Sequence, residues 1–182
     1  MTSQEPTIDS RRIYEGRVVK LRVDTVRLPD GRTSLREIVE HRGAAVIVPL
    51  DGQGSVILVR QYRKAAEELL LEVPAGTLEP GENPIQCAQR ELQEEAGYSA
   101  DRLQPLPPFW SAPGFTTERM YPFVATGLHP QSARADEDER IEPVTVPLSQ
   151  VPLMIRSGEI RDAKSIASLL MVLYLHKVGE QR

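Results

Sequence analysis

Apolar and polar side chains alternate in the first part of the chain, a pattern that predicts β-structure. Within residues 17–28, every second position suits a strand with one buried face. The positions expected on that face are Val19, Leu21, Val23 and Thr25. The turn-forming residues 29–31 (Pro-Asp-Gly) separate this strand from a second predicted strand at 34–41. Residues 1–10 are polar and include a proline, which favours a loose lead-in.

Two or three strands bury little apolar surface by themselves. We therefore expect the N-terminal sheet to pack on the rest of the chain or on another copy of it. The expected division is an N-terminal β-sheet element at 1–41 and a main domain at 42–182.

Longer apolar segments predict the core of the main domain. The continuous apolar run at 43–50 is typical of a buried strand. A glycine-containing turn at 51–54 leads into another apolar stretch, 55–62, which we expect to form a hairpin with it. Further strands are predicted at 121–126 and 143–146.

Helical signals lie between and after these strands. Asn83 is a favourable N-cap, Pro84 suits the first helical position and Gly97 suits the end of the helix. Its apolar stripe is Ile85, Ala88 and Leu92. Short helices are also expected to begin near Ser149 and Asp162. The apolar face of the second is Ile166, Leu169, Leu170, Leu173 and Tyr174. This order predicts a mixed fold of the α/β (α+β) class, with a largely mixed or antiparallel sheet.

Composition narrows the possible partners. The net charge of −4 disfavours nucleic acid and anionic membranes, because proteins that bind these by broad electrostatics are normally basic. Cys87 is the only cysteine, so no internal disulfide and no cysteine cluster for a metal are possible. The start of the chain lacks the pattern of a secretion signal, and the longest apolar runs are far shorter than the ~18 residues of a membrane span. We expect a soluble, cytoplasmic protein.

Three carboxylates stand out on the predicted helix. Glu91, Glu94 and Glu95 share one face, since residues three and four apart are neighbours on a helix. An ordinary solvated face is one interpretation, although such a face more often interleaves lysines, and only Arg90 is nearby. The other interpretation is a site for a divalent cation, which would relieve the repulsion. Oxygen ligands point to Mg²⁺ or Mn²⁺.

The whole segment from Gly76 to Gly97 resembles the Nudix box. That pattern is Gly, five residues, Glu, seven residues, Arg-Glu, an aliphatic residue, any residue, Glu-Glu, any residue, Gly. Its positions are filled here by Gly76, Glu82, Arg90, Glu91, Leu92, Glu94, Glu95 and Gly97. Chance would produce this match on the order of 10⁻⁸ times per start position. The next position is usually aliphatic and is Tyr98 here, a difference that concerns packing.

The resemblance implies a Nudix fold, an α/β/α sandwich, and hydrolysis of a nucleoside diphosphate linked to another moiety. In such proteins a cation neutralises the diphosphate and lowers the pKa of a bound water. The residues that the resemblance assigns to the metal are Glu91 and Glu95, with Glu94 in support and the backbone carbonyl of Ala75. By the same resemblance, Arg90 orients Glu82 or a neighbouring glutamate through an ion pair.

Other segments resemble the ADP-ribose pyrophosphatase subgroup. Residues 111–118 (Ser-Ala-Pro-Gly-Phe-Thr-Thr-Glu) are similar to its Ser-Pro-Gly element, with an alanine inserted before the proline or replacing the serine. An ordinary Pro-Gly turn is the alternative. Residues 35–41 resemble the strand leading into its core, 61–63 its substrate-facing strand end, and 135–142 its acidic catalytic loop.

This second resemblance implies substrate contacts at matching positions. Arg36 and Glu37 would reach substrate from the N-terminal strands, and Arg63 would pair with phosphate or stack at the nucleotide. Arginine suits phosphate because its guanidinium donates two parallel hydrogen bonds. Glu118 would hold the terminal ribose, since a carboxylate accepts from two hydroxyls. Gly76, at the start of the box, is also assigned to the substrate site.

Within the acidic loop, the resemblance assigns Glu137 as general base and Glu139 as a further metal ligand. A solvated acidic turn and a lid that closes on substrate both fit this composition. Phe109 and Trp110 directly precede the segment 111–118. We interpret them as core residues in preference to an adenine pocket.

The sequence thus favours an Mg²⁺-dependent enzyme, with Mn²⁺ or another divalent cation possible, that converts ADP-ribose and water to AMP and ribose 5-phosphate. A broader nucleoside-diphosphate-sugar pyrophosphatase and a non-catalytic ADP-ribose sensor are the alternatives. In this subgroup the N-terminal sheets of two subunits are exchanged. The resemblance therefore implies a domain-swapped homodimer in which Arg36 and Glu37 serve the partner's site.

Overall fold

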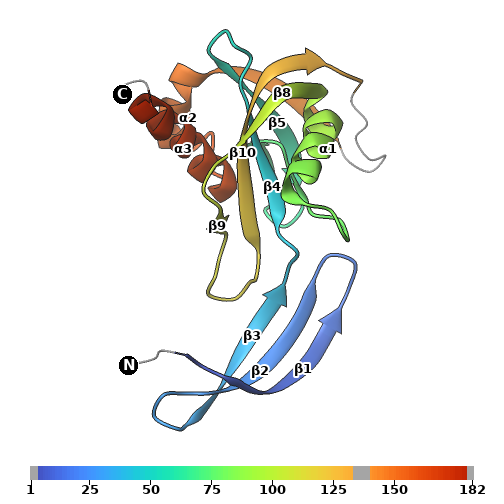
Figure 1. Ribbon diagram of the computed structural model, residues 1–182, viewed down its shortest axis with the longest axis vertical. Helices are drawn as coiled ribbons and strands as arrows, with labels where there is room; N and C mark the ends of the chain where they lie inside the picture. Colours follow the sequence, from blue (N-terminus) through green and yellow to red (C-terminus); the bar gives the residue numbers. More distant parts are fainter. Residues whose placement is uncertain (1–3, 133–139, 180–182) are drawn as a thin grey trace. The chain divides into compact units, whose positions relative to one another are not determined.

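The chain forms two compact units in its computed structural model, which describes residues 4–132 and 140–179 (Figure 1). One unit comprises the chain up to Gly43 together with Trp110–Arg119. The other comprises Ala44–Phe109 and the chain from Met120 onward. The segment 110–119 thus belongs with the N-terminal strands although it is far from them in sequence.

The first unit is built on an antiparallel sheet of three strands, β1 (Thr7–Glu15), β2 (Lys20–Arg27) and β3 (Thr33–Glu40), in the order β1-β2-β3. The expected loose lead-in at 1–10 is wrong from Thr7 onward, because β1 begins there. All nine residues of β1 are exposed. β1 therefore forms through backbone pairing with β2. Because neither of its faces is buried, its sequence lacks the alternation of apolar and polar residues that predicts a strand.

The buried side of β2 is the opposite of the one predicted. Asp24 and Val26 are 2% and 4% exposed, whereas Val19 is 44% exposed and the other predicted inward positions are half-buried. Asp24 is shielded by its neighbours, since its carboxylate accepts hydrogen bonds of 2.6 Å from both the Ser10 hydroxyl and the Arg22 guanidinium. Polar contacts within the sheet thus cover a face that the apolar pattern assigned to solvent.

The segment 110–119 is attached to β3 by its backbone. The Val39 N–H donates to Phe115 O at 2.8 Å, and the Thr117 N–H donates to Val39 O at 3.0 Å. Trp110, in the short strand β9 (Phe109–Trp110), is 52% exposed, so its interpretation as a core residue is wrong. The Arg119 guanidinium lies 5.7 Å from the centre of its ring and stabilises this exposed position by a cation–π contact.

The part of the second unit that the structure describes contains two sheets. One has the order β7-β4-β10-β8, with β9 also paired to β10. Its strands are β4 (Ala44–Pro49), β7 (Ala75–Thr77), β8 (Tyr98–Pro105) and β10 (Arg119–Pro130), with β4 and β10 parallel. The other sheet is antiparallel, in the order β11-β5-β6. Its strands are β5 (Ser55–Arg63), β6 (Glu68–Glu72) and β11 (Ile141–Pro147).

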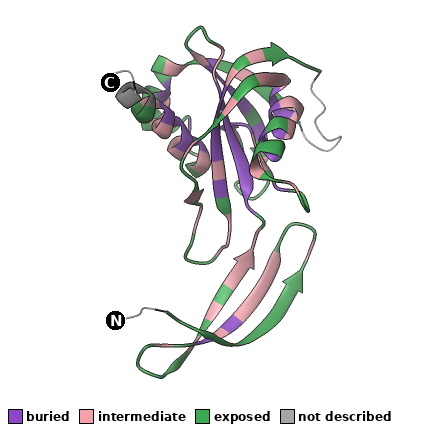
Figure 2. Cartoon of the chain, viewed as in Figure 1, coloured by how far each residue is buried: buried purple, intermediate pink, exposed green. Residues whose placement is uncertain are grey.

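The expected hairpin between 43–50 and 55–62 is wrong, because β4 and β5 belong to different sheets. Only a single bridge, Leu50 to Val56, joins them. The turn itself forms as predicted, with the Asp51 carboxylate accepting from the backbone N–H of Ser55 at 2.9 Å. Every residue of β4 is buried (Figure 2). Both strands contribute side chains to the same core, so they pack together while taking different hydrogen-bonding partners.

Among the described residues, three helices cover the sheets: α1 (Pro84–Ala96), α2 (Val151–Ser157) and α3 (Ala163–Gly179). A 3-10 turn, Leu148–Gln150, precedes α2. One core cluster joins α1 to alternate residues of β4, and the other joins α2 and α3 to the remaining ones. Figure 1 shows α1 and the α2–α3 pair on opposite sides of β4. The predicted α/β/α sandwich is therefore confirmed.

The buried face of α3 differs in part from the prediction. Leu169 is fully buried as expected, but Tyr174 is 69% exposed. Two serines, Ser165 and Ser168, are fully buried instead. Ser165 is placed there by polar contacts, since its hydroxyl accepts the backbone N–H of Val73 at 2.9 Å. In the part of the chain that the structure describes, no helix is long and apolar enough to cross a membrane.

Candidate active site

Helix α1 presents the candidate site, and its ends are fixed as the sequence predicted. The Asn83 side chain accepts the Gln86 N–H at 3.0 Å, while the Gln86 side chain accepts the Asn83 N–H at 3.1 Å. This reciprocal pair is a capping box. Gly97 ends the helix in the left-handed conformation at φ 72°. The helix between these caps places its glutamates beside β7.

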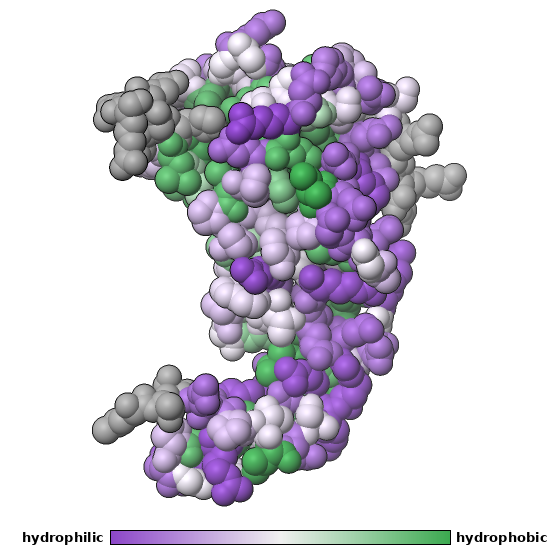
Figure 3. Space-filling model, in the orientation of Figure 1, coloured by the Kyte–Doolittle hydropathy of each residue, from purple (hydrophilic) through white to green (hydrophobic). Residues whose placement is uncertain are grey.

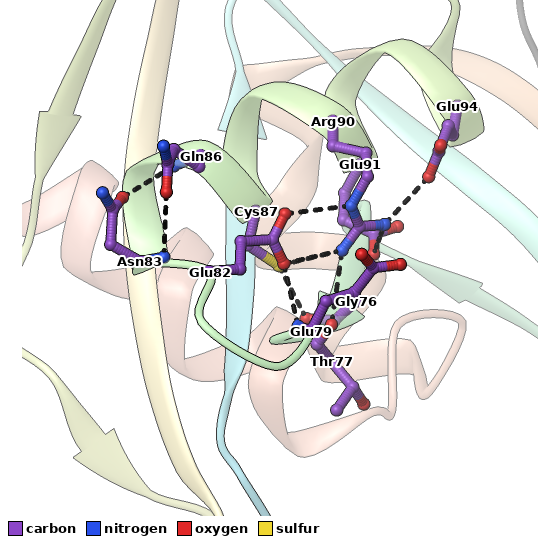
Figure 4. Close-up of polar contacts among 10 residues, drawn as sticks. All are labelled: Gly76, Thr77, Glu79, Glu82, Asn83, Gln86, Cys87, Arg90, Glu91 and Glu94. Carbon is purple, nitrogen blue, oxygen red and sulfur yellow. Dashed lines mark hydrogen bonds and ion pairs between the residues drawn. The ribbon is translucent and has the colours of Figure 1, made fainter.

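Arg90 is the centre of the polar contacts in Figure 4. Its guanidinium binds Glu82 bidentately, with two distances of 3.0 Å. Its Nη1 also donates to Glu91 at 2.6 Å and to Glu94 at 2.9 Å. Its Nη2 contacts the Thr77 carbonyl at 3.3 Å. The arginine thus gathers three carboxylates of the box.

The charges around Arg90 shift the pKa values of this cluster. The hydrogen bonds that Arg90 donates to Glu82 hold the pKa of Arg90 well above its usual value, so the guanidinium stays charged. The same contact lowers the pKa of Glu82. Burial raises the pKa of the neighbouring Cys87 thiol to about 12. Cys87 is therefore a neutral packing residue, and its thiol contacts the Gly76 carbonyl at 3.4 Å.

The two innermost glutamates are buried against β7. Glu91 is 8% exposed and Glu95 is 7% exposed. A Cβ atom on Gly76 would lie 1.6 Å from Glu91 Oε1, so only glycine leaves room for this carboxylate. Glu95 Oε2 accepts the Ala75 N–H at 2.8 Å. Both carboxylates are therefore positioned by the backbone of 75–76.

These groups line a cavity of about 310 Å³ between the end of β5, β7 and α1. The lining residues are Arg63, Ala75, Gly76, Thr77, Glu79, Arg90, Glu91, Glu94 and Glu95. Carboxylates outnumber guanidinium groups in this lining, so the cavity repels an anionic substrate until a cation enters.

The donor set fits a hard divalent cation, because carboxylate and carbonyl oxygens are the ligands that Mg²⁺ and Mn²⁺ prefer. Among the described residues, no three acidic, histidine or cysteine side chains form a ready metal-binding group. One oxygen of Glu91 and one oxygen of Glu94 accept hydrogen bonds from Arg90. A cation entering the cavity would therefore compete with Arg90 for these oxygens.

Arg63 reaches the cavity from the end of β5 and is anchored by a residue that sequence reasoning missed. Glu72, the last residue of β6, binds the Arg63 guanidinium through two hydrogen bonds of 2.9 and 2.8 Å. The signal for Glu72 was present in the sequence as a single acid inside the apolar stretch 69–73, directly before the box.

The remaining predicted substrate residues lie in the first unit. Arg36 pairs there with Glu5 at 2.8 Å, and Glu37 is exposed on β3. Glu118 lies 3.6 Å from His41. The cavity lining within the second unit includes none of these side chains. The predicted base and metal ligand of the acidic loop, Glu137 and Glu139, lie outside the described residues.

Comparison with known proteins defines the class to which this fold and site belong. The NUDIX domain profile matches residues 40–169, and the profile of the nucleoside diphosphate sugar hydrolase N-terminal domain matches residues 5–39. The chain therefore belongs to the Nudix family. Nudix hydrolases generally require divalent cations, in agreement with the oxygen-rich cavity.

Particular relatives refine this placement. The chain is 40% identical over 164 residues to the ADP-ribose pyrophosphatase of Bacillus subtilis, covering 89% of both chains. It is also 40% identical over 168 residues to the methanol dehydrogenase activator of Bacillus methanolicus, covering 91% of both. A crystal structure of an ADP compounds hydrolase superposes with a TM-score of 0.86 at 25% identity, covering 97% of this chain and 96% of that one.

Proposed function

We propose that this protein hydrolyses the diphosphate of ADP-ribose, giving AMP and ribose 5-phosphate, with the help of a divalent cation. The observation that carries the proposal is the cavity beside α1, where buried Glu91 and Glu95 lie next to the Ala75–Gly76 backbone. The name and high coverage of the Bacillus subtilis relative support the choice of substrate.

Each residue of the cavity has a distinct proposed task. Glu91 and Glu95 hold the cation, with Glu94 and the Ala75 carbonyl in support. When bound, the cation neutralises diphosphate charge and lowers the pKa of a water. Arg90 keeps the box carboxylates gathered through the contacts described above. Arg63 directs a guanidinium at the substrate's phosphates. Mg²⁺ is the proposed cation, and Mn²⁺ has the same ligand preference.

The roles of Glu137 as general base and Glu139 as a further metal ligand stay predictions. If Glu137 is the base, Glu137→Gln loses rate while ADP-ribose binds with similar affinity. Glu139→Gln instead shifts the cation concentration needed for activity. The reverse pattern would exchange the two roles. If neither substitution changes the activity, the loop is a solvated turn.

We also propose a homodimer in which the N-terminal sheets are exchanged. This sheet and the turn between β1 and β2 expose several large apolar side chains, and Figure 3 shows hydrophobic surface among the polar residues there. Those more than 40% exposed are Ile8, Ile13, Tyr14, Val18, Val19 and Leu35. Large exposed apolar patches mark interaction sites. In the exchanged dimer, Arg36 and Glu37 reach the partner's cavity and Glu118 holds the terminal ribose. A cytoplasmic location stays a prediction.

The direct test is a chromatographic screen of the purified chain with Mg²⁺ and then Mn²⁺. The substrates are ADP-ribose, ADP-glucose, GDP-mannose, NADH and diadenosine polyphosphates. We expect ADP-ribose to give AMP with the highest kcat/KM, and a Glu95→Gln preparation to lack this activity. Equal turnover of several sugars would favour a broader pyrophosphatase. GDP-mannose is in the screen because the chain is 35% identical over 153 residues to the GDP-mannose pyrophosphatase of Yersinia pestis. Binding of ADP-ribose without turnover would make the protein a sensor.

A further inference from the structure

Glu72 is a buried acid that neither the box nor the cavity lining accounts for. It is 1% exposed, and its neighbours Leu71 and Val73 are buried apolar residues. Burying a carboxylate at such a position is strongly unfavourable unless the charge is paired and hydrogen-bonded. The partners of Glu72 therefore indicate what it does.

Two cations meet the Glu72 carboxylate. Arg63 donates from Nε to one oxygen at 2.9 Å and from Nη2 to the other at 2.8 Å. Lys164, from the start of α3, contacts the second oxygen as well. Burial alone would raise the pKa of Glu72, but the hydrogen bonds from Arg63 and the charge of Lys164 outweigh it, and the pKa is lowered. Glu72 is therefore an anion at neutral pH.

The charge of Lys164 is compensated on its other side. Its ammonium group lies 2.9 Å from Asp162, whose carboxylate also accepts the backbone N–H of Ser165 at 3.0 Å. Ser165 in turn fixes the residue after Glu72, because its hydroxyl accepts the Val73 N–H. The beginning of α3 thus holds the end of β6, and with it Glu72, in one place.

Only one member of this network reaches the cavity. Arg63 lines it together with Glu91 and Glu95, and its side chain is 38% exposed. The charge of Glu95 contributes to a raised pKa for Arg63, after the larger effect of the Glu72 hydrogen bonds. The two bonds to Glu72 use Nε and Nη2 and leave Nη1 outside the pair. The plane of the guanidinium is therefore set before any substrate binds.

We propose that Glu72 is a positioning residue that holds the Arg63 guanidinium at the cavity, ready for the diphosphate of the substrate. The inference rests on the proposed pyrophosphatase function. A mobile arginine side chain loses rotamer entropy when it is ordered by a ligand. Glu72 removes that cost from substrate binding, and it directs Nη1 toward the phosphates.

The test measures kcat and KM for ADP-ribose hydrolysis together with the melting temperature. Glu72→Gln keeps the shape but removes the charge, so we expect kcat/KM to fall by ~10 to 100-fold. Lys164→Met is the matched control, because it breaks the other ion pair of Glu72 and leaves Arg63 bound. It should lower the melting temperature while kcat/KM stays within about threefold of the wild-type value.

A double variant separates positioning from a purely structural role. In an Arg63→Met background, Glu72→Gln should cause almost no further loss of kcat/KM, because the residue it positions is gone. A full additional loss there would overturn the proposal, as would wild-type kcat/KM in the folded Glu72→Gln protein. If Glu72→Gln does not fold, Glu72→Asp keeps the charge but draws the guanidinium back, and unchanged kcat/KM would then overturn it. A wild-type protein inactive on every substrate of the screen would instead refute the proposed function.

Discussion

The carboxylate of Glu91 occupies the space where the side chain of residue 76 would be. A Cβ atom built on Gly76 meets Glu91 Oε1 at 1.6 Å and the carboxyl carbon at 1.9 Å. These atoms are the far end of a flexible side chain, so Glu91 would move aside with little damage to the fold. Glycine at this position therefore serves the site, because it lets a buried carboxylate lie directly against the β7 backbone.

Gly76→Ala should accordingly remove activity without unfolding the protein. We expect kcat for ADP-ribose to fall by about 100-fold, since a displacement of ~1 Å in a positioned group has an effect of that size. Circular dichroism and the melting temperature should change little. The control is a double-mutant cycle with Glu91→Gln, in which Gly76→Ala should add almost nothing. Wild-type kcat in Gly76→Ala would show that the position of Glu91 is irrelevant to turnover.

Glu91 and Glu95 should be the carboxylates on which the cation depends most. Replacing either with Gln should reduce kcat by orders of magnitude and raise the Mg²⁺ concentration needed for residual activity, while the fold survives. The natural comparison is Glu94→Gln, because the Glu94 side chain is 35% exposed and only supports the site. Its effect should be clearly smaller. Near-wild-type turnover in both Glu91→Gln and Glu95→Gln would remove the metal-site interpretation.

The Arg90–Glu82 contact should make stability depend on pH in the acid range. The hydrogen bonds from Arg90 lower the pKa of Glu82 from its ordinary value of 4.5. The stabilisation by this pair is thus complete above about pH 4.5 and is lost as the pH falls through the lower, folded-state pKa. The free energies of unfolding of the wild type and Glu82→Gln, measured in urea, should therefore differ most near pH 7 and become similar toward pH 3.

The matched control for this titration is Glu67→Gln. Glu67 pairs with Lys64 in an exposed turn, where its side chain is 71% exposed. Surface pairs of this kind contribute little, so its free energy of unfolding should stay within about 0.5 kcal/mol of the wild-type value at every pH. If the free energies of unfolding of the wild type and Glu82→Gln differed by the same amount from pH 7 to pH 3, the expected dependence of stability on the pKa of Glu82 would be contradicted.

Local signals in the sequence predicted the helix of the site well. The caps at Asn83 and Gly97 act through neighbouring backbone groups, so residue type and spacing determine them. The same holds for the shared face of Glu91 and Glu95, which follows from helical periodicity. Both are properties of one segment, and the structure places them as the sequence predicted.

Contacts between distant segments were not predictable in this way. The apolar stretches at 43–50 and 55–62 looked like hairpin partners, but each pairs with a strand far away in sequence. The role of Glu72 was not predicted, because its partners Arg63 and Lys164 come from different elements. The apolar alternation in β2 was misleading for a similar reason, since the shield of Asp24 includes Ser10 on a strand that the sequence did not reveal.

The exchange of N-terminal sheets should appear as complementation between two inactive variants. Arg36→Ala disables the arginine of the first unit, and Glu91→Gln disables the cavity of the second. When the two are mixed under conditions that let subunits exchange, a mixed dimer with exchanged sheets contains one site in which both residues are intact. We therefore expect ADP-ribose hydrolysis to return. A mixture of Glu91→Gln with Glu95→Gln should stay inactive, because both residues belong to the same cavity and every site keeps a defect. No recovery in the first mixture would mean that Arg36 serves its own chain or no site at all, and a monomer by light scattering at micromolar concentration would refute the exchanged dimer.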